Sequence, residues 1–267
     1  MPVSPAVPSG DRRPLRARVR AGTPVIATFV KTASHQTLEI LGLSGLDAAI
    51  IDAEHAPFDR ATLDRMIAAA PSALPVMVRV PSHDPAFING CLDMGATGLL
   101  VPHTCDAAGA RAIAQSVKYG LGKRGFSPSG RAGGYGTVDG ARYRAQADAL
   151  STIWCQIEDA EALDALDEIA AVEEIDCLFI GPADLSLSLG AAGPADPRVQ
   201  AAIRAVAEAG RRHHRSVGMF IGQTAQIPAL LALGITVFVC GSDQGLLLGR
   251  ARELAGELAR TARETVD

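Results

Sequence analysis

The chain has 267 residues, 48% of them hydrophobic, so it is long and apolar enough to bury the core of one large domain. Its formal net charge is −4, and its basic residues form no stripe interleaved with aromatic residues, which argues against nucleic acid as the main partner. No apolar stretch approaches the length of a membrane span, and the first residues lack the apolar core of a signal peptide, which together predict a cytoplasmic protein.

Residues 1–11 are predicted to form a flexible tail, and residues 12–267 are predicted to form a single domain. A short helix containing Leu15 and Val19 opens this domain. Eight apolar runs follow, and they lack the polar alternation of a half-exposed strand, so they are typical of parallel strands covered on both faces. The predicted strands span residues 24–30, 48–54, 75–80, 98–103, 152–158, 177–184, 217–222 and 236–243.

Helix-compatible segments lie between most of these strands. They span residues 59–70, 85–94, 106–119, 141–150, 159–171, 197–213 and 226–233. One helix after each strand is the pattern of a (β/α)8 TIM barrel, an α/β fold. An open, doubly wound sheet is the alternative, because a count of eight strands does not by itself prove that the sheet closes.

Polar and charged side chains gather where the apolar runs end. A barrel places its functional groups at the carboxyl ends of its strands, which face the βα loops. The residues predicted at these ends are Asp52, Glu54, His55, Arg79, His103, Gln156, Glu158, Asp184 and Asp243. Their position predicts a functional site at this end of the barrel.

Two of the carboxylates, Glu158 and Asp184, follow neighbouring apolar runs. Carboxylates on neighbouring strands can share a hard divalent cation, such as Mg2+, Mn2+ or Co2+, and still leave positions free for substrate oxygens. The alternative is structural, because Asp159 and Asp184 both stand where a helix can begin and can serve as N-caps.

His55 is the best candidate for a general base, since Asp52 or Glu54 can set its tautomer and basicity. Arg79 ends an otherwise apolar strand, where a guanidinium needs a partner. A bound carboxylate or enolate offers it a planar, bidentate one. The structural alternative is an ion pair between Arg79 and Asp52 or Glu54.

The glycine-rich loop, residues 120–136, is the one long interruption of the alternation, and loops of this length are usually functional. Its segment 120–125 matches G-x-G-x-x-G, but a helical segment precedes it and no helix follows directly, so we reject a dinucleotide site. Basic residues of this loop, Lys123, Arg124 and Arg131, are placed at the barrel mouth, where they meet either an anionic substrate or solvent.

The chain contains three lysines, Lys31, Lys118 and Lys123. None of them is predicted to end a barrel strand, as the lysine of a Schiff-base enzyme would.

In combination and in order, the blocks IDAEHAP, VRVPS, LDMGATGLLVP, QIED and GPADLS resemble the class II, metal-dependent pyruvate aldolase family of the HpcH/HpaI type. The resemblance runs from about Leu15 to the end of the chain. It implies a TIM barrel of the phosphoenolpyruvate/pyruvate type and a homohexamer. The chain departs from the family most in its glycine-rich loop and over residues 190–235, which leaves the aldehyde specificity open.

The resemblance also implies roles for individual residues. Glu158 and Asp184 are expected to bind the metal, and His55 is expected to act as the acid and base, supported by Asp52 and Asp93. The residues expected to hold the substrate are Arg79, Gln156, Gly181, Pro182, Ala183 and Asp184.

These roles combine into one mechanism, in which a 4-hydroxy-2-oxo acid is cleaved to pyruvate and an aldehyde. His55 removes the proton of the C4 hydroxyl, the C3–C4 bond breaks, and the metal and Arg79 carry the charge of the enolate. The alternatives are a citryl- or malyl-CoA-type lyase, an oxo-acid decarboxylase on the same scaffold, or a protein that binds oxo acids without catalysis.

Asp93 is predicted to lie at the face of the barrel opposite its own His55, at the end of a descending helix. A supporting role would therefore act on the histidine of a neighbouring subunit. The structural alternative is that Asp93 caps a turn before Gly95.

Overall fold

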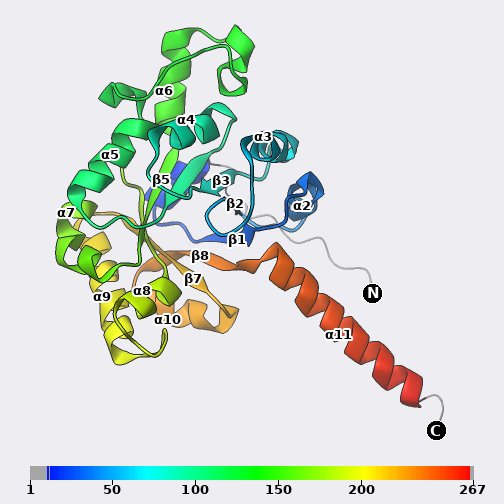
Figure 1. Cartoon of the computed structure of the whole chain (residues 1–267). Coiled ribbons are helices and arrows are strands. Elements are labelled where there is room, and N and C mark those ends of the chain that lie inside the picture. The colour runs from blue at the N-terminus through cyan, green and yellow to red at the C-terminus, as the bar shows by residue number, and fades with distance from the viewer. Residues whose placement is uncertain (1–10, 12, 265–267) are drawn as a thin grey trace.

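The computed structural model describes residue 11 and residues 13–264, so nearly all of the predicted tail, residues 1–11, lies outside the described residues. Eight parallel strands close into one barrel in chain order, with β8 pairing β1 (Figure 1). The strands are β1 Val25–Val30, β2 Ala48–Asp52, β3 Val76–Arg79, β4 Gly98–Val101, β5 Thr152–Ile157, β6 Cys177–Ile180, β7 Ser216–Ile221 and β8 Ile235–Ser242. All eight predicted strands and the TIM barrel are confirmed, and the open sheet is wrong.

Helices follow the strands around the barrel. The α-helices are α1 Leu15–Arg20, α2 His35–Leu41, α3 Arg60–Ala69, α4 Pro85–Asp93, α5 Ala107–Val117, α6 Gly140–Leu150, α7 Leu166–Ala170, α8 Pro182–Ser188, α9 Pro197–Arg212, α10 Ile227–Ala232 and α11 Asp243–Glu264. The 3-10 helices are η1 Tyr119–Leu121, η2 Arg131–Gly136, η3 Ala160–Ala165 and η4 Thr224–Gln226. The sequence pattern predicts none of α2, α8 and α11. The first residues of α8 fall within the predicted strand 177–184, because Pro182 comes directly after the apolar run.

The barrel interior is filled by large side chains and closed at its amino end. Trp154 of β5 and Phe179 of β6 are both buried and stack with their ring centroids 6.0 Å apart. Leu15 and Val19 of α1 belong to the same buried cluster, so this helix covers the amino ends of the strands. A second, larger cluster lies between the strands and the surrounding helices. The interior therefore opens at the carboxyl ends, where the polar strand-end residues lie.

The glycine-rich loop lies at the amino end of the barrel, which corrects its predicted position at the mouth. The loop follows α5 and so begins where that helix has returned to the amino ends of the strands. Arg124 is buried, donates to the carbonyl of Val117, and shares a cavity with Thr97 and Ser151, the residues that precede β4 and β5. The basic side chains of this loop therefore do not face the substrate pocket of their own barrel.

Helix α11 leaves the barrel instead of packing along it (Figure 1). It begins directly after β8 at Asp243, and its contacts with the barrel are with β1 and β8. Leu247, Leu254 and Leu258 recur at helical spacing along it and are all exposed, Leu247 by 75%. This helix presents an apolar stripe that its own barrel does not cover.

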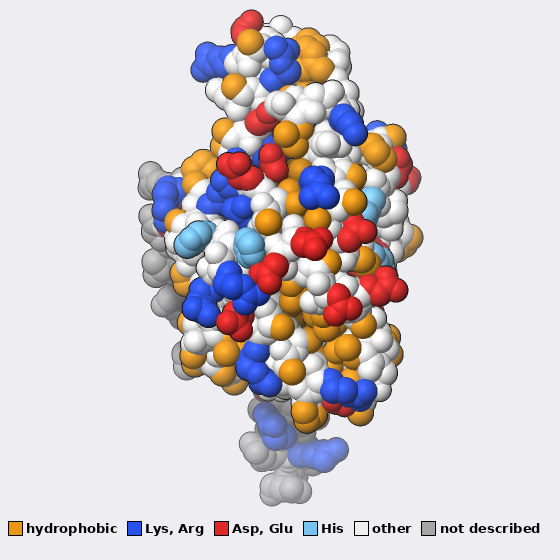
Figure 2. Space-filling model, turned by 90° about the vertical axis from the view of Figure 1, so that its left-hand side faces the viewer, with side chains coloured by type: hydrophobic (Ala, Val, Ile, Leu, Met, Phe, Trp, Pro, Cys, Tyr) orange, Lys and Arg blue, Asp and Glu red, His pale blue; other side chains and the backbone are white. Residues whose placement is uncertain are grey.

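The outer surface carries both signs of charge. On the face shown in Figure 2, acidic and basic side chains are interspersed and do not gather by sign. Within the described part of the chain, no helix combines the length and the apolar character needed to span a membrane.

Candidate active site

A cavity of about 320 Å³ opens at the carboxyl ends of the strands. Seven residues that the sequence predicted for the site line it: His55, Arg79, Gln156, Gly181, Pro182, Ala183 and Asp184. They come from β3 and β5 and from the segments that follow β2 and β6. The topology therefore brings together residues that are far apart in the sequence.

Asp52 is the buried anion at the centre of this site. It ends β2 and is fully buried, and Arg79 donates to both of its oxygens, from Nε at 2.9 Å and from Nη2 at 2.7 Å. The backbone N–H of His55 donates to the same carboxylate at 3.2 Å, and the Lys31 ammonium lies 3.1 Å away. The structural alternative for Arg79, an ion pair with Asp52, is thus realised.

The pKa of Asp52 reflects two opposing effects. Burial raises it, but the hydrogen bonds and charge of Arg79, with the His55 N–H and Lys31, lower it more, so the pKa lies below its ordinary value. Asp52 is therefore an anion at neutral pH. It fixes the guanidinium that faces the pocket, and Arg79 also stacks on Phe29, with its Cζ 4.6 Å from the ring centroid.

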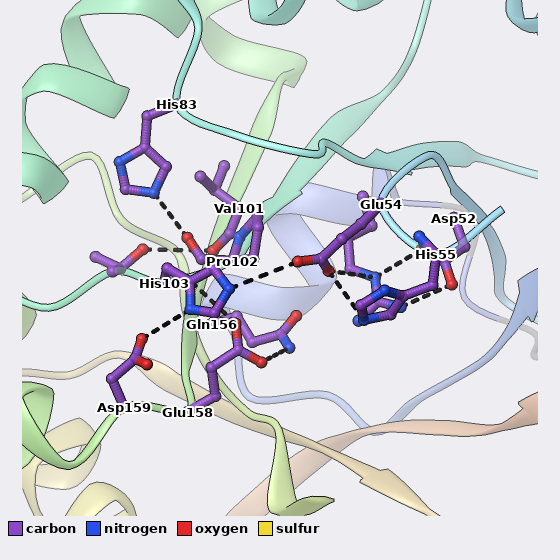
Figure 3. A network of polar contacts seen from close by, with 12 residues as sticks. Asp52, Glu54, His55, His83, Val101, Pro102, His103, Gln156, Glu158 and Asp159 are labelled. Carbon is purple, nitrogen blue, oxygen red and sulfur yellow. Dashed lines mark hydrogen bonds and ion pairs between the residues drawn. The ribbon is translucent and has the colours of Figure 1, made fainter. Parts of the chain in front are cut away.

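His55 lies in the turn after β2, and its side chain is half-exposed at the pocket. Its Nε2 is 3.7 Å from Glu54 Oε2, while Asp52 contacts its backbone and not its ring. In this geometry Glu54 is the acid beside the imidazole, and Asp52 holds the turn that carries it (Figure 3).

Glu158, which follows β5, is the second buried acid. It accepts from the backbone N–H of His103 at 3.0 Å and from Nε2 of Gln156. Burial raises its pKa, and these donors offset the effect only in part. Gly181 packs against both side chains, since a Cβ there would lie 2.8 Å from Glu158 Oε2 and 2.9 Å from Gln156 Nε2. Only glycine fits at this position without displacing them.

His103 also belongs to the site, in a role that the sequence pattern did not indicate. It was predicted at a strand end but given no role, and its backbone adopts φ = +52°, which is uncommon for a residue with a side chain. Its Nδ1 lies 3.0 Å from Asp159, a hydrogen bond that raises the pKa of His103. Ligand atoms of Glu54, His103 and Glu158 all lie within 4.8 Å of one another (Figure 3).

The residues present fit a divalent metal ion, which the resemblance implies. The cluster of Glu54, His103 and Glu158 offers hard carboxylate oxygens and an imidazole nitrogen. Beside it, the buried Oε1 of Gln156 has no hydrogen-bond partner among the described residues. A buried acceptor left without a partner is satisfied by a bound cation or by its water.

Asp184 lies in the first turn of α8 and lines the same pocket. The predicted alternative of N-capping does not describe the two acids, since Gly181 occupies the cap of α8 and Asp159 makes no capping hydrogen bond to η3. Asp159 instead contacts His103.

Lys31, to which the sequence pattern gave no role in the site, lines the pocket as well. It directly follows β1. Since the predicted strand also ended at residue 30, the position of Lys31 directly after it is the signal that could have found it.

Asp93 lies where it was predicted, at the end of the descending α4. It accepts a hydrogen bond from Nη2 of Arg124, at 3.1 Å, in the glycine-rich loop. This contact ties the loop to α4 at the face opposite His55.

The barrel, with an arginine, a half-exposed histidine and buried acids at its mouth, is the arrangement of a carbon–carbon lyase that stabilises an enolate. The family model of the HpcH/HpaI aldolase/citrate lyase family matches residues 26–249, so the chain belongs to this family. This membership confirms the resemblance read from the sequence and makes the protein a lyase of the aldolase class.

Two relatives and one solved structure show how close the likeness is. The chain is 38% identical to a 5-keto-4-deoxy-D-glucarate aldolase of Shigella boydii over 220 residues, covering 81% of this chain and 85% of that protein. It is 38% identical to a 2-dehydro-3,6-dideoxy-6-sulfogluconate aldolase of Pseudomonas putida over 251 residues, 90% of this chain and 95% of the relative. A family protein from Burkholderia cenocepacia superposes with a TM-score of 0.86 at 29% identity, over 92% of this chain and 98% of the other.

Gly181→Ala should disturb the site without unfolding the barrel, because the added Cβ displaces the ends of Glu158 and Gln156. We expect the affinity for Mn2+, measured by titration calorimetry, to fall by about tenfold or more. Gly222→Ala is the matched control, since Gly222 directly follows β7 and its Cβ would meet open space. An unchanged Mn2+ affinity in Gly181→Ala would show that the packing against Glu158 has no part in metal binding.

Proposed function

We propose that the protein is a metal-dependent aldolase that reversibly cleaves 4-hydroxy-2-oxo acids into pyruvate, or a close analogue, and an aldehyde. The observation that carries this proposal is the Arg79 guanidinium, fixed by buried Asp52 in a pocket that it shares with His55, Gln156 and Asp184. Gln156 in turn donates to the buried acid after β5, Glu158. The named relatives, both sugar-acid aldolases, favour this reaction over a CoA-thioester lyase.

Glu158 and Asp184 are proposed to hold the metal, and Glu54 and His103, which cluster with Glu158, offer further ligand atoms. A divalent ion held there, Mg2+, Mn2+ or Co2+, would supply Lewis-acid polarisation of the carboxylate and keto oxygens of the substrate. Gln156 and the segment Gly181–Ala183 line the pocket beside Glu158 and are proposed to hold the oxo-acid end.

The proton and the charge are handled by two side chains. In cleavage, His55 takes the proton of the C4 hydroxyl, the C3–C4 bond breaks, and its electron pair forms the enolate of pyruvate. Asp52 engages Nε and Nη2 of Arg79, so the remaining edge of the guanidinium donates to the enolate oxygen. The proton that His55 took up then returns to C3 of the enolate, directly or through water, which gives pyruvate and regenerates the neutral base, and the aldehyde leaves from the side of His55.

Exchange of the methyl protons of pyruvate with D2O tests this proposal, because it needs the enolate but no aldehyde. We expect the wild type to catalyse exchange, followed by NMR, with Mg2+ and to lose it with a chelator. Glu158→Gln and Asp184→Asn should each slow exchange by at least about a hundredfold, the scale of losing one group that stabilises the enolate charge. Asp167→Asn, on the exposed outer surface, is the control.

The pH dependence adds a second readout. A proton and a metal ion compete for Glu158, whose pKa is raised, so Mn2+ affinity should fall as the pH drops through that pKa. Glu158→Gln should remove this part of the dependence and leave the part that comes from His103, whose pKa is also raised. Exchange that persists in either metal-site variant would show that the residue is not a ligand.

We further propose a homo-oligomer, with six subunits as the resemblance implies, and a cytoplasmic location, which the free thiols of the five cysteines suit. The exposed leucine stripe of α11 supports assembly, because an apolar stripe of this kind is normally covered. Leu254→Glu combined with Leu258→Glu should therefore reduce the mass measured by light scattering. An assembly of unchanged mass would exclude this stripe from the interface.

Asp93 is proposed to support the histidine of a neighbouring subunit, since it lies at the face opposite its own His55. Mixing inactive Asp93→Ala with inactive Glu158→Ala protein and re-associating the subunits should restore partial activity. No recovery in oligomers shown to be mixed would leave Asp93 with its contact to Arg124 alone.

A further inference from the structure

One half of the pocket is formed by β1, β7, β8 and the start of α11, and it differs in character from the half that holds the acids. Phe29 and Phe220 lie side by side there, with their ring centroids 6.0 Å apart, and Gly241 and Gly245 leave the wall open. Among the described residues that line this half, Lys31 is the one that carries a charge. A substrate group that reaches this wall therefore meets two aromatic rings and one ammonium.

The Lys31 ammonium is only partly engaged by the protein. Its one ion pair in the described part of the chain is with Oδ2 of Asp52, at 3.1 Å, an oxygen that also accepts from Nη2 of Arg79. An ammonium has three donors, and the Lys31 side chain is 29% exposed, against 7% for Arg79. Lys31 thus keeps donors for a ligand, whereas Asp52 already occupies two of the donors of Arg79.

The backbone around Lys31 is held in place by the start of α11, which follows β8, the strand that pairs with β1. The carboxylate of Asp243, at the start of α11, accepts from the backbone N–H of Lys31 at 2.8 Å and from that of Thr32 at 3.1 Å. The turn after β1 therefore does not have to be ordered when a ligand binds, which lowers the entropic cost of using the ammonium.

We propose that Lys31 binds an anionic group, carboxylate or sulfonate, at the aldehyde end of the substrate. This inference rests on the proposed aldolase function, and it names the substrate class as 4-hydroxy-2-oxo acids that carry a second negative charge. The names of the two relatives fit this class: a glucarate bears a carboxylate at each end, and a sulfogluconate bears a sulfonate opposite its carboxylate.

The arrangement assigns one cation to each end of the substrate. Arg79 faces the enolate that forms from the oxo-acid end, and Lys31 faces the fragment that leaves as the aldehyde. Because both cations contact Asp52, neither stands in the pocket without an anionic partner before the substrate arrives.

The test compares aldehydes that differ in charge as acceptors for pyruvate, in reactions that contain Mg2+. The anionic aldehydes are succinic semialdehyde and 3-oxopropane-1-sulfonate, and the neutral one is the methyl ester of succinic semialdehyde. The readout is the ratio of kcat/KM for each anionic aldehyde to kcat/KM for the ester. A ratio cancels any general loss of activity in a variant, and a comparison of the two anions shows which one the subsite prefers.

Lys31→Met should lower this ratio by roughly 10- to 100-fold, the size of one hydrogen bond to a charged group. Lys31→Arg should retain most of the ratio because it retains the charge. Lys123→Met, which removes an exposed lysine of the glycine-rich loop, is the matched control and should leave the ratio at the wild-type value.

The inference is overturned if Lys31→Met keeps a ratio within about threefold of the wild type, the range of an exposed charge pair. It is also overturned if Lys31→Met and Lys31→Arg lose activity equally on charged and neutral aldehydes, because Lys31 would then only support Asp52. Pyruvate proton exchange by the wild type separates a failure of this inference from a failure of the proposed function, since the absence of exchange would contradict the aldolase function itself.

Discussion

A single buried carboxylate, that of Asp52, organises the mouth of this barrel. Removing a carboxylate from water costs several kcal/mol, and the cost is offset only when the charge is paired and its oxygens accept hydrogen bonds. Here the donors come from three neighbouring segments: Lys31 after β1, the His55 N–H after β2, and Arg79 at the end of β3. Satisfying one anion therefore fixes the turn that carries His55, the guanidinium of Arg79 and the ammonium of Lys31 relative to one another.

The strand ends make this arrangement possible because the barrel is closed at its other end. With α1 packed under the interior and large rings filling it, polar groups can be solvated only at the carboxyl ends. The second buried acid, Glu158, has fewer charged donors than Asp52, and its pKa is raised where that of Asp52 is lowered. The two carboxylates at this rim thus differ in how far their charge is balanced: Asp52 is already paired with two cations, whereas the charge of Glu158 is not yet fully paired.

The sequence predicted the barrel well because buried parallel strands leave a simple trace, a short apolar run followed by a polar residue. The same pattern predicted the polar lining residues His55, Arg79, Gln156 and Asp184, whereas the segment 181–183 was expected from the family resemblance, and Lys31 and the aromatic wall were not predicted. It did not predict the backbone of His103, since a positive φ at a non-glycine residue leaves no compositional mark. The glycine-rich loop was misplaced because its length was weighed before its position after a helix, which puts it at the amino end. The residues of α11 have the apolar spacing of a helix, but the direction in which this helix leaves the barrel depends on contacts that its local sequence does not show.

The two halves of the pocket are constrained to different degrees. On the side of β2 to β6, acids, glycine and guanidinium contact one another at hydrogen-bond distance, and Gly181 admits no larger side chain, so a change in one residue displaces others. On the side of β7, β8 and β1, the wall is built from two aromatic rings, glycines, Ser242 and Lys31. This wall contacts the acidic half at two points, Lys31 against Asp52 and Phe29 against the guanidinium of Arg79. Substitutions on this second side alter the shape and charge of the wall, and those at Lys31 or Phe29 also change what Asp52 or Arg79 contacts. Under the proposed function, a pocket divided in this way keeps one reaction at the oxo-acid end and accepts different aldehydes at the other, with Lys31 among the residues that couple the two.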